Sequence, residues 1–301
     1  MLKYIKYSEI PTYGDPIGDG QIFCGEVSFM GGIMINERII LSDDGRASLD
    51  TYVTFNTSGA LRRAVLICPG GGYHGVSPRE AEPIALAFAA KGYNAFVLWY
   101  RVGQEGDVYP RQLIDASRAI LHIRENAEKY GIIKDKVAVL GFSAGGHLAG
   151  SLATMYDDPE LTELLGVSPS EIRPDAAVLC YPVITAYEPT HKGSFKNLLG
   201  KEFEDLTDEE REKFSIEKRV NLNTPPMFIW HTAKDKGVPL VGSLALTKRL
   251  FELDIPVSTR IYPYGGHGLA LGNEDTAGAP SHIQPIAAKW IDEAAEFLAT
   301  L

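Results

Sequence analysis

The sequence predicts an α/β fold with a mostly parallel central sheet and helices on both faces of that sheet. From residue 64 onward, short apolar runs alternate with longer segments of helical character, the pattern of parallel strands joined by crossover helices. Most of these runs lack polar alternation, as expected of strands that are covered on both faces. The predicted strands are 64–68, 95–100, 137–140, 176–181, 227–230 and 257–262.

The first 60 residues follow a different pattern, typical of antiparallel strands. Two runs, from Glu26 to Ile40 and from Ser48 to Phe55, are separated by the turn Asp43-Asp44-Gly45. Asp and Gly favour tight turns between paired strands. We expect these N-terminal strands to extend one edge of the sheet.

Helix signals lie between the predicted strands and after the last of them. The segment 77–80 reads Ser-Pro-Arg-Glu, in which the serine can cap a helix and Glu80 completes a capping box. Pro83 can instead delay the regular start by a turn, and the helix should run to Lys91. An apolar stripe over 283–301 predicts a last helix that docks on the sheet.

A charged insertion separates the predicted strands 176–181 and 227–230. It contains the capping box Thr207-Asp208-Glu209-Glu210. We interpret about 185–222 as a small, partly helical cap over the active face, the alternative being a solvated surface excursion. Because 45% of the residues are hydrophobic and no internal repeat is found, we expect a single domain over 1–301, with residues 1–60 forming its N-terminal antiparallel strands.

Composition excludes several classes of partner. The net charge of -10 would repel nucleic acid and anionic membranes, and no apolar run reaches the roughly 18 residues of a membrane span. No signal peptide is evident, so we expect a soluble, cytoplasmic protein. The three cysteines cannot all pair, and no metal-binding motif is present. We expect no metal and no cofactor, and the oligomeric state stays open.

The segment Gly141-Phe142-Ser143-Ala144-Gly145 has the pattern of a nucleophile elbow. It lies between the predicted strand 137–140 and the small-residue helix 144–155. A serine on such a strand-to-helix turn is lifted clear of the sheet, and flanking glycines avoid collisions in the tight turn. We therefore predict Ser143 as the nucleophile of an α/β-hydrolase.

A second glycine-rich loop, Pro69-Gly70-Gly71-Gly72-Tyr73, follows the first parallel strand. An α/β-hydrolase places backbone N–H groups of its oxyanion hole there. We predict Gly71, Gly72 and Ala144 as the donors. The same loop matches the dinucleotide pattern Gly-x-Gly-x-x-Gly, but an NAD-dependent oxidoreductase is disfavoured because no acidic residue lies between residues 83 and 100 to bind a ribose.

In this fold the acid and the histidine follow the serine in that order, on loops after late strands. Asp235 follows the strand 227–230, and His267 follows the strand 257–262. We predict His267 as the general base and Asp235 as its orienting acid. Asp254 and Asp275 fit the layout less well, and flanking lysines leave open that Asp235 is a surface residue.

Further residues border the predicted site. His147 shares a helix face with Ser143, and we expect it to be structural because it points into the packing. Tyr73, His74 and Tyr181 are candidate substrate contacts, although aromatic residues at strand ends are more often part of the core.

Four blocks together resemble the bacterial acetyl esterase and xylan-esterase-like lipases of the α/β-hydrolase superfamily. The blocks are Ile67-Cys68-Pro69-Gly70-Gly71-Gly72-Tyr73, Gly141 to Ala149, Pro225 to Thr232 and Pro263 to Gly268. The resemblance implies Ser143, Asp235 and His267 as the triad and Gly71, Gly72 and Ala144 as the oxyanion hole. Two departures are Pro69, where the related lipases carry His, and Lys234, where a second Asp is frequent.

The expected function is a serine esterase that hydrolyses short-chain carboxylic esters through an acyl-serine intermediate. The resemblance implies a small-molecule ester as substrate, with acetyl esters of sugars or xylo-oligosaccharides as the expected class. An amide or formamide hydrolase or a peptidase is the alternative, because the same triad serves both leaving groups. A ligand-binding relative without catalysis is disfavoured by the full set of catalytic residue types.

Overall fold

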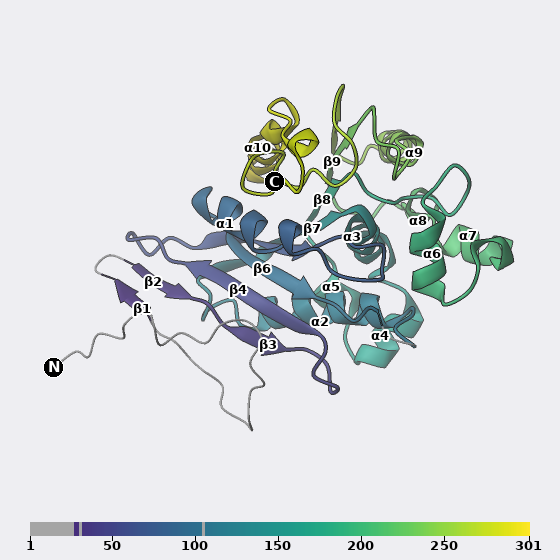
Figure 1. Cartoon of the computed structure of the whole chain (residues 1–301). Helices are drawn as coiled ribbons and strands as arrows, with labels where there is room; N and C mark the ends of the chain where they lie inside the picture. Colours follow the sequence, from purple (N-terminus) through teal and green to yellow (C-terminus); the bar gives the residue numbers. More distant parts are fainter. Residues whose placement is uncertain (1–26, 30–31, 104–105) are drawn as a thin grey trace.

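One mixed sheet forms the centre of the molecule in the computed structural model, which describes residues 27–29, 32–103 and 106–301 (Figure 1). Over these residues the strand order is β1-β2-β4-β6-β5-β7-β8-β9-β10, with β3 beside β4. The strands are β1 Val27–Phe29, β2 Gly32–Ile35, β3 Arg38–Ile40, β4 Ser48–Thr54, β5 Arg62–Cys68, β6 Asn94–Trp99, β7 Ile132–Phe142, β8 Ala176–Cys180, β9 Met227–Thr232 and β10 Val257–Tyr262.

The strands from β5 to β10 run parallel, as the uninterrupted apolar runs predict. Their register aligns the carboxyl ends, since Cys68 pairs with Gly141 and Phe142 with Cys180. The loops that follow β5, β7, β8, β9 and β10 therefore leave the sheet at one edge. This edge carries every residue of the predicted site.

The N-terminal strands are antiparallel and extend the sheet beyond β6, as predicted. β4 pairs with β6, and β2 and β3 pair with β4, all antiparallel. The long run expected from residue 26 to 40 is divided into β1, β2 and β3. Its first residue, Glu26, and the cysteine Cys24 lie outside the described residues.

Helices cover both faces of the sheet (Figure 1). They are α1 Glu82–Ala90, α2 Arg111–Glu125, α3 Ser143–Met155, α4 Pro159–Leu165, α5 Pro169–Ile172, α6 Lys192–Leu199, α7 Asp208–Phe214, α8 Ile216–Arg219, α9 Val241–Glu252 and α10 Trp290–Ala299. Short 3₁₀ helices are η2 Pro78–Glu80, η3 Phe203–Asp205, η4 Pro280–His282 and η5 Ala287–Lys289. The mostly parallel sheet with these two helical layers is the α/β-hydrolase fold.

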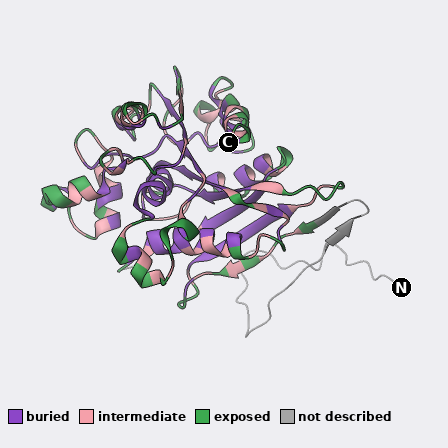
Figure 2. Cartoon of the chain, turned by 180° about the vertical axis from the view of Figure 1, so that it is seen from behind, coloured by how far each residue is buried: buried purple, intermediate pink, exposed green. Residues whose placement is uncertain are grey.

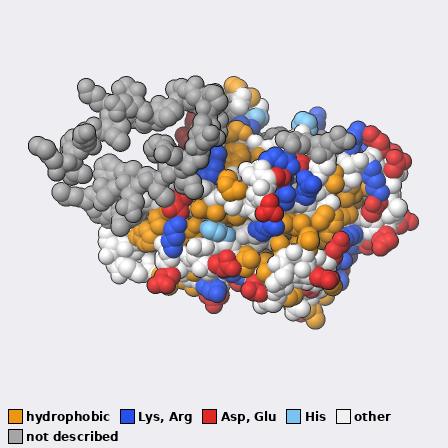
Figure 3. All heavy atoms as spheres, turned by 90° about the horizontal axis from the view of Figure 1, so that it is seen from below, with side chains coloured by type: hydrophobic (Ala, Val, Ile, Leu, Met, Phe, Trp, Pro, Cys, Tyr) orange, Lys and Arg blue, Asp and Glu red, His pale blue; other side chains and the backbone are white. Residues whose placement is uncertain are grey.

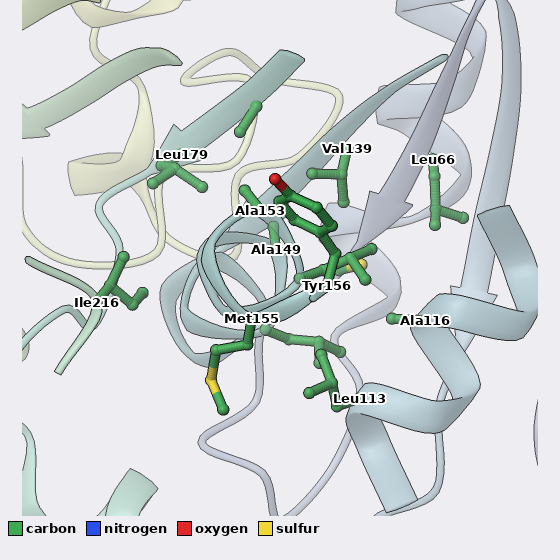
Figure 4. Packing of buried hydrophobic residues seen from close by; sticks show 14 of the residues in the cluster. Leu66, Leu113, Ala116, Val139, Ala149, Ala153, Met155, Tyr156, Leu179 and Ile216 are labelled. Carbon is green, nitrogen blue, oxygen red and sulfur yellow. The ribbon is translucent and has the colours of Figure 1, made fainter. Parts of the chain in front are cut away.

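Each face of the sheet has its own hydrophobic core. Phe88 of α1 and Trp290 of α10 belong to the core on one face, and Leu113 of α2 and Leu246 of α9 belong to the other. Figure 2 shows the central strands buried and the outer faces of the helices exposed. In Figure 4, Ala149 and the rest of α3 lie among the buried side chains of the second core. The helix that begins at Ser143 is thus held inside the molecule.

The first crossover helix begins later than its capping signal suggests. Residues 78–80 form η2, and α1 starts at Glu82 with Pro83 in its first turn, the alternative that Pro83 indicates. Ser77 makes no side-chain cap. Glu80 is buried rather than capping, so the capping box predicted here is wrong.

The C-terminal helix is also shorter than its apolar stripe predicts. α10 begins at Trp290, and Ile286 is 54% exposed. Pro285 has no backbone donor and cannot stand inside a helix without disrupting it. The stripe packs against the sheet from Trp290 onward.

The insertion predicted as a cap contains α6, η3, α7 and α8. The capping box at its centre is confirmed, because Thr207 and Glu210 exchange hydrogen bonds at the start of α7. Acidic and basic side chains are interspersed on the face shown in Figure 3. Within the described part of the chain, no helix is long and apolar enough to span a bilayer.

Candidate active site

Ser143 lies at the tip of a strand-to-helix turn. β7 ends at Phe142 and α3 begins at Ser143, whose backbone has a φ of +54°. A positive φ is uncommon for a residue with a side chain and carries a conformational cost, which the surrounding packing must offset. The strained turn directs the Ser143 hydroxyl away from the sheet, as the nucleophile elbow predicts.

The two glycines of the motif are required by close backbone approach. A methyl group on Gly141 would lie 2.0 Å from the carbonyl oxygen of Gly145. One on Gly145 would lie 2.2 Å and 2.3 Å from the carbonyl oxygens of Cys68 and Pro69. Since these neighbours are backbone atoms, they cannot rotate away, and the glycines let the elbow pack against the loop after β5.

The structure brings Ser143, His267 and Asp235 together from three loops. Ser143 Oγ lies 2.8 Å from His267 Nε2, and His267 Nδ1 lies 2.7 Å from Asp235 Oδ2. With Nδ1–H donating to the carboxylate, Nε2 is free to accept the serine hydroxyl proton. The arrangement is that of a Ser-His-Asp triad. The catalytic roles of the three residues stay predictions.

Asp235 is held as a buried carboxylate. Its side chain is fully buried, and Oδ1 accepts the N–H groups of Gly237 and Val238 at 2.8 Å and 2.9 Å. His231 Nε2 lies 3.3 Å from Oδ2. Burial alone would raise the pKa of Asp235, but the hydrogen bonds from His231, His267 and Val238 outweigh it and hold the pKa well below the usual range.

The three carboxylates that the sequence offers as the acid differ in their contacts. Lys234 and Lys236 are exposed, and neither pairs with the carboxylate of Asp235 among the ion pairs of the described chain. Asp254 is exposed at the end of α9. Asp275 accepts a hydrogen bond from Asn273. Of the three carboxylates, Asp235 is the one that contacts His267.

The glycine-rich loop lies against the elbow. Gly71 and Gly72 have φ values of +137° and +64°, and the carbonyl of Gly71 accepts the N–H groups of His74 and Gly75. Across the described residues, the N–H groups of Gly71, Gly72 and Ala144 donate to no other group of the chain. They are available to a substrate oxygen, and their role as the oxyanion hole stays a prediction.

The tyrosines proposed as substrate contacts are buried behind the site. Tyr73 is 2% exposed and Tyr181 is 1% exposed, so their side chains have almost no surface for a ligand. This corrects the expectation that either ring contacts substrate, because packing against the loops removes both from solvent. His74 is exposed and stays a candidate.

His147 is structural, as predicted. It is buried, and its Nδ1 accepts the hydroxyl proton of Tyr73 while Nε2–H donates to the carbonyl of Phe214, both at 2.9 Å. Burial lowers the pKa of His147 to about 4. The neutral ring therefore joins the glycine-rich loop after β5 to α7 of the insertion.

Sequence reasoning missed two residues of the insertion that reach the glycine-rich loop after β5. Asn197 of α6 donates to the carbonyl of Gly72 at 2.8 Å. The ring of His191 lies close to the same glycine, since a methyl group on Gly72 would be 3.9 Å from His191 Cε1. Neither residue belongs to a recognisable motif, so only the fold could identify them.

Sequence reasoning also missed the buried Glu80, whose carboxylate accepts the N–H of Gly70 at 2.8 Å and the hydroxyl of Tyr181 at 2.6 Å. Because Glu80 stands shortly before a helix, the sequence pattern indicated a capping residue instead.

No group of three His, Cys, Asp or Glu side chains is placed to hold a metal ion in the part of the chain that the structure describes.

Comparison with known proteins identifies the family of this chain. The BD-FAE family model matches residues 49–250. Endo-1,4-beta-xylanase B of Butyrivibrio fibrisolvens is 42% identical over 231 residues, 74% of this chain and 35% of that protein. An acetylxylan esterase of Xylanibacter ruminicola is 32% identical over 237 residues, 77% of this chain and 45% of that protein. The chain thus spans less than half the length of both relatives.

A solved structure matches over most of both chains. The acetyl ester-xyloside bifunctional hydrolase of Caldicellulosiruptor lactoaceticus is 33% identical, with a TM-score of 0.72, and the match covers 84% of this chain and 88% of that one. The family match runs from within β4 to within α9 and includes the glycine-rich loop after β5 and the turn at Ser143. The chain therefore belongs to the BD-FAE family of α/β-hydrolases.

Proposed function

We propose that this protein is a serine esterase that hydrolyses short-chain carboxylic esters, with acetyl esters of sugars or xylo-oligosaccharides as its substrates. The proposal depends above all on the 2.8 Å contact between Ser143 Oγ and His267 Nε2. A general base within hydrogen-bonding distance of a strained elbow serine is the arrangement needed for nucleophilic attack on an acyl carbon.

In the proposed reaction, Ser143 Oγ attacks the carbonyl carbon of the ester while His267 takes the hydroxyl proton. The N–H groups of Gly71, Gly72 and Ala144 stabilise the oxyanion that forms, a contribution of about 2.7 to 4 kcal/mol for one donor. His267 then protonates the leaving alcohol. A water molecule, deprotonated by His267, hydrolyses the acyl-serine and releases the carboxylic acid.

The substrate class rests on the relatives. The acetylxylan esterase is named for acetyl esters of xylan, and the bifunctional hydrolase is named for acetyl esters and xylosides. The cap offers polar groups beside the oxyanion loop, since His191 and Asn197 both lie against Gly72. A polar rim of this kind suits a hydroxyl-rich leaving group better than a long acyl chain.

The test is turnover of p-nitrophenyl esters from acetyl upward, together with acetylated xylo-oligosaccharides. We expect the highest kcat/KM with acetyl, and labelling of Ser143 by a fluorophosphonate. Ser143→Ala should abolish turnover and labelling without changing the melting temperature, because the methyl side chain fits the same turn. Wild-type protein that neither turns over an ester nor reacts with the probe would contradict the proposal.

The same assay separates the alternative amide chemistry. N-formyl aromatics and aminoacyl amides are compared with the esters at equal enzyme concentration. A kcat/KM for an amide above that of every ester would assign the same triad to a different bond.

A further inference from the structure

Glu80 is a buried acidic residue that the proposed reaction does not use. It is 4% exposed, and no Lys or Arg nitrogen lies within 4.0 Å of its carboxylate among the ion pairs of the described residues. A buried carboxylate without a paired cation is costly unless hydrogen bonds satisfy it. Its partners therefore indicate what it does.

The carboxylate of Glu80 joins the oxyanion loop to the strand end beside the base. Oε2 accepts the N–H of Gly70 at 2.8 Å, and Oε1 accepts the hydroxyl proton of Tyr181 at 2.6 Å. The fit is close, because a methyl group on Gly70 would lie 2.7 Å from Oε2 and 3.1 Å from Ser143 Cβ. A shift of this carboxylate would therefore displace the loop that contains Gly70, which lies next to Ser143.

Tyr181 connects Glu80 to the histidine loop, which is the segment after β10 that contains His267 and Ala270. Its hydroxyl oxygen accepts the N–H of Ala270 at 2.9 Å, so the hydroxyl proton is directed at Glu80. The Tyr181 ring packs edge-on against the ring of His267, with centroids 5.0 Å apart. Tyr181 and Ala270 both have a positive φ, a strained backbone that such contacts can hold in place.

The neighbouring Arg79 binds the same histidine loop from another side. Its guanidinium donates to the carbonyls of Thr276 at 2.6 Å and Gly268 at 3.0 Å. The short helix η2 therefore contacts the oxyanion loop through Glu80 and the histidine loop through Arg79. The helix η2 thus connects the loop after β5 to the loop after β10, two parts of the candidate site that are distant in the sequence.

We propose that Glu80 is a positioning residue that fixes the oxyanion loop and the His267 loop relative to Ser143, and that its negative charge supports the imidazolium of His267. This inference rests on the proposed esterase function. Glu80 has no contact with substrate and acts through Gly70 and Tyr181. Charge and geometry both matter, so replacing the carboxylate should change the chemical step more than substrate binding.

Other groups share this environment. The titratable or charged side chains that face Glu80 or His267 are Arg79, Tyr100, Cys180, Tyr181, His191 and Asp235. Burial raises the pKa of Glu80, while the hydrogen bonds from Tyr181 and Gly70 and the charges of His267 and Arg79 oppose that rise. Measurements are therefore made at several pH values rather than at one.

The experiment compares Glu80→Gln and Tyr181→Phe with the matched control Glu82→Gln, an exposed carboxylate two residues away. We expect Glu80→Gln to lower kcat for p-nitrophenyl acetate by roughly 10- to 100-fold, the size of effect that a small misplacement causes, with KM changed by less than about threefold. The acid limb of kcat/KM should move to lower pH by roughly 0.5 pH units, because the imidazolium loses a stabilising charge.

Tyr181→Phe removes the hydroxyl that donates to Glu80 and accepts from Ala270, so it should lower kcat by breaking the same link. The two effects should not add in the double variant, since both act through one chain of contacts. Glu82→Gln should match wild type. If Glu80→Gln fails to fold, as judged by its melting curve, Tyr181→Phe and Glu80→Asp carry the test.

Titration of the His267 ring, followed by NMR, keeps this inference separate from the proposed function. In Glu80→Gln the midpoint of that titration should move to lower pH even if no ester is turned over. An unchanged titration, or a kcat within twofold of wild type, would overturn the role of Glu80 while leaving the esterase proposal intact.

Discussion

At the scale of single residues, the candidate site shows how a carboxylate stays ionised in a buried place. Asp235 has a fully buried side chain, yet it accepts hydrogen bonds on both oxygens from two backbone N–H groups and from His267. These donors replace the water that burial removes. Asp235 therefore has the environment to orient the base and to stabilise the imidazolium.

Asp235→Asn should lower kcat on the order of 10³- to 10⁴-fold, because an amide cannot fix the required tautomer of His267. KM should change little, and the measurement is steady-state kinetics with p-nitrophenyl acetate. Asp254→Asn is the control, since Asp254 is exposed and its positive φ is tolerated by Asn. A kcat for Asp235→Asn within tenfold of wild type would show that another residue orients the base.

At the scale of elements, the strand-to-helix turn depends on contacts between backbones. The first turn of α3 packs directly against the loop after β5, with Gly145 at the contact. Further along the same helix, Gly150 faces the side chain of Ile216, whose terminal methyl would lie 2.5 Å from a methyl group added to the glycine. A methyl group on Gly145 would meet backbone atoms, which cannot rotate away, whereas one on Gly150 would meet the end of a flexible side chain.

Gly145→Ala should destabilise the protein by roughly 1 to 3 kcal/mol, as overpacking typically does, and should displace the oxyanion loop. Gly150→Ala should be nearly neutral, because Ile216 can adjust and alanine favours the helix by up to about 1 kcal/mol. Urea unfolding of both variants measures the difference. Equal stability of the two would show that the loop after β5 yields as easily as Ile216.

At the scale of the whole molecule, buried titratable groups connect layers that lie far apart in the sequence. His147 joins the oxyanion loop to the cap as a neutral ring, since burial lowers its pKa to about 4. An unfolded chain returns this histidine to its usual pKa of about 6.5. The unfolded state therefore binds the proton first when the pH falls.

The free energy of unfolding should thus decrease between about pH 6.5 and pH 4, with His147 contributing on the order of 3 kcal/mol. His147→Gln removes that part of the pH dependence, whereas His74→Gln, at an exposed histidine, should retain it. Urea unfolding at several pH values measures the slopes. Parallel curves for wild type and His147→Gln would contradict the assignment.

The sheet and the three residues of the candidate triad could both be predicted from local sequence patterns. Apolar runs marked the parallel strands, and Ser143, Asp235 and His267 could be predicted because each follows a strand in the order that the fold requires. These signals are local, because a strand and the turn after it are close together in the chain. Register of the parallel strands then brings their carboxyl ends to one edge.

The groups that support the site could be identified only from the folded chain. Glu80 looked like a helix cap, and Tyr73 and Tyr181 looked like substrate contacts, because their partners are absent from the local sequence. Glu80 meets a hydroxyl 101 residues away, and His147 meets Tyr73 at a separation of 74. Burial and hydrogen bonding between such distant segments arise when the chain packs, and no local pattern encodes them.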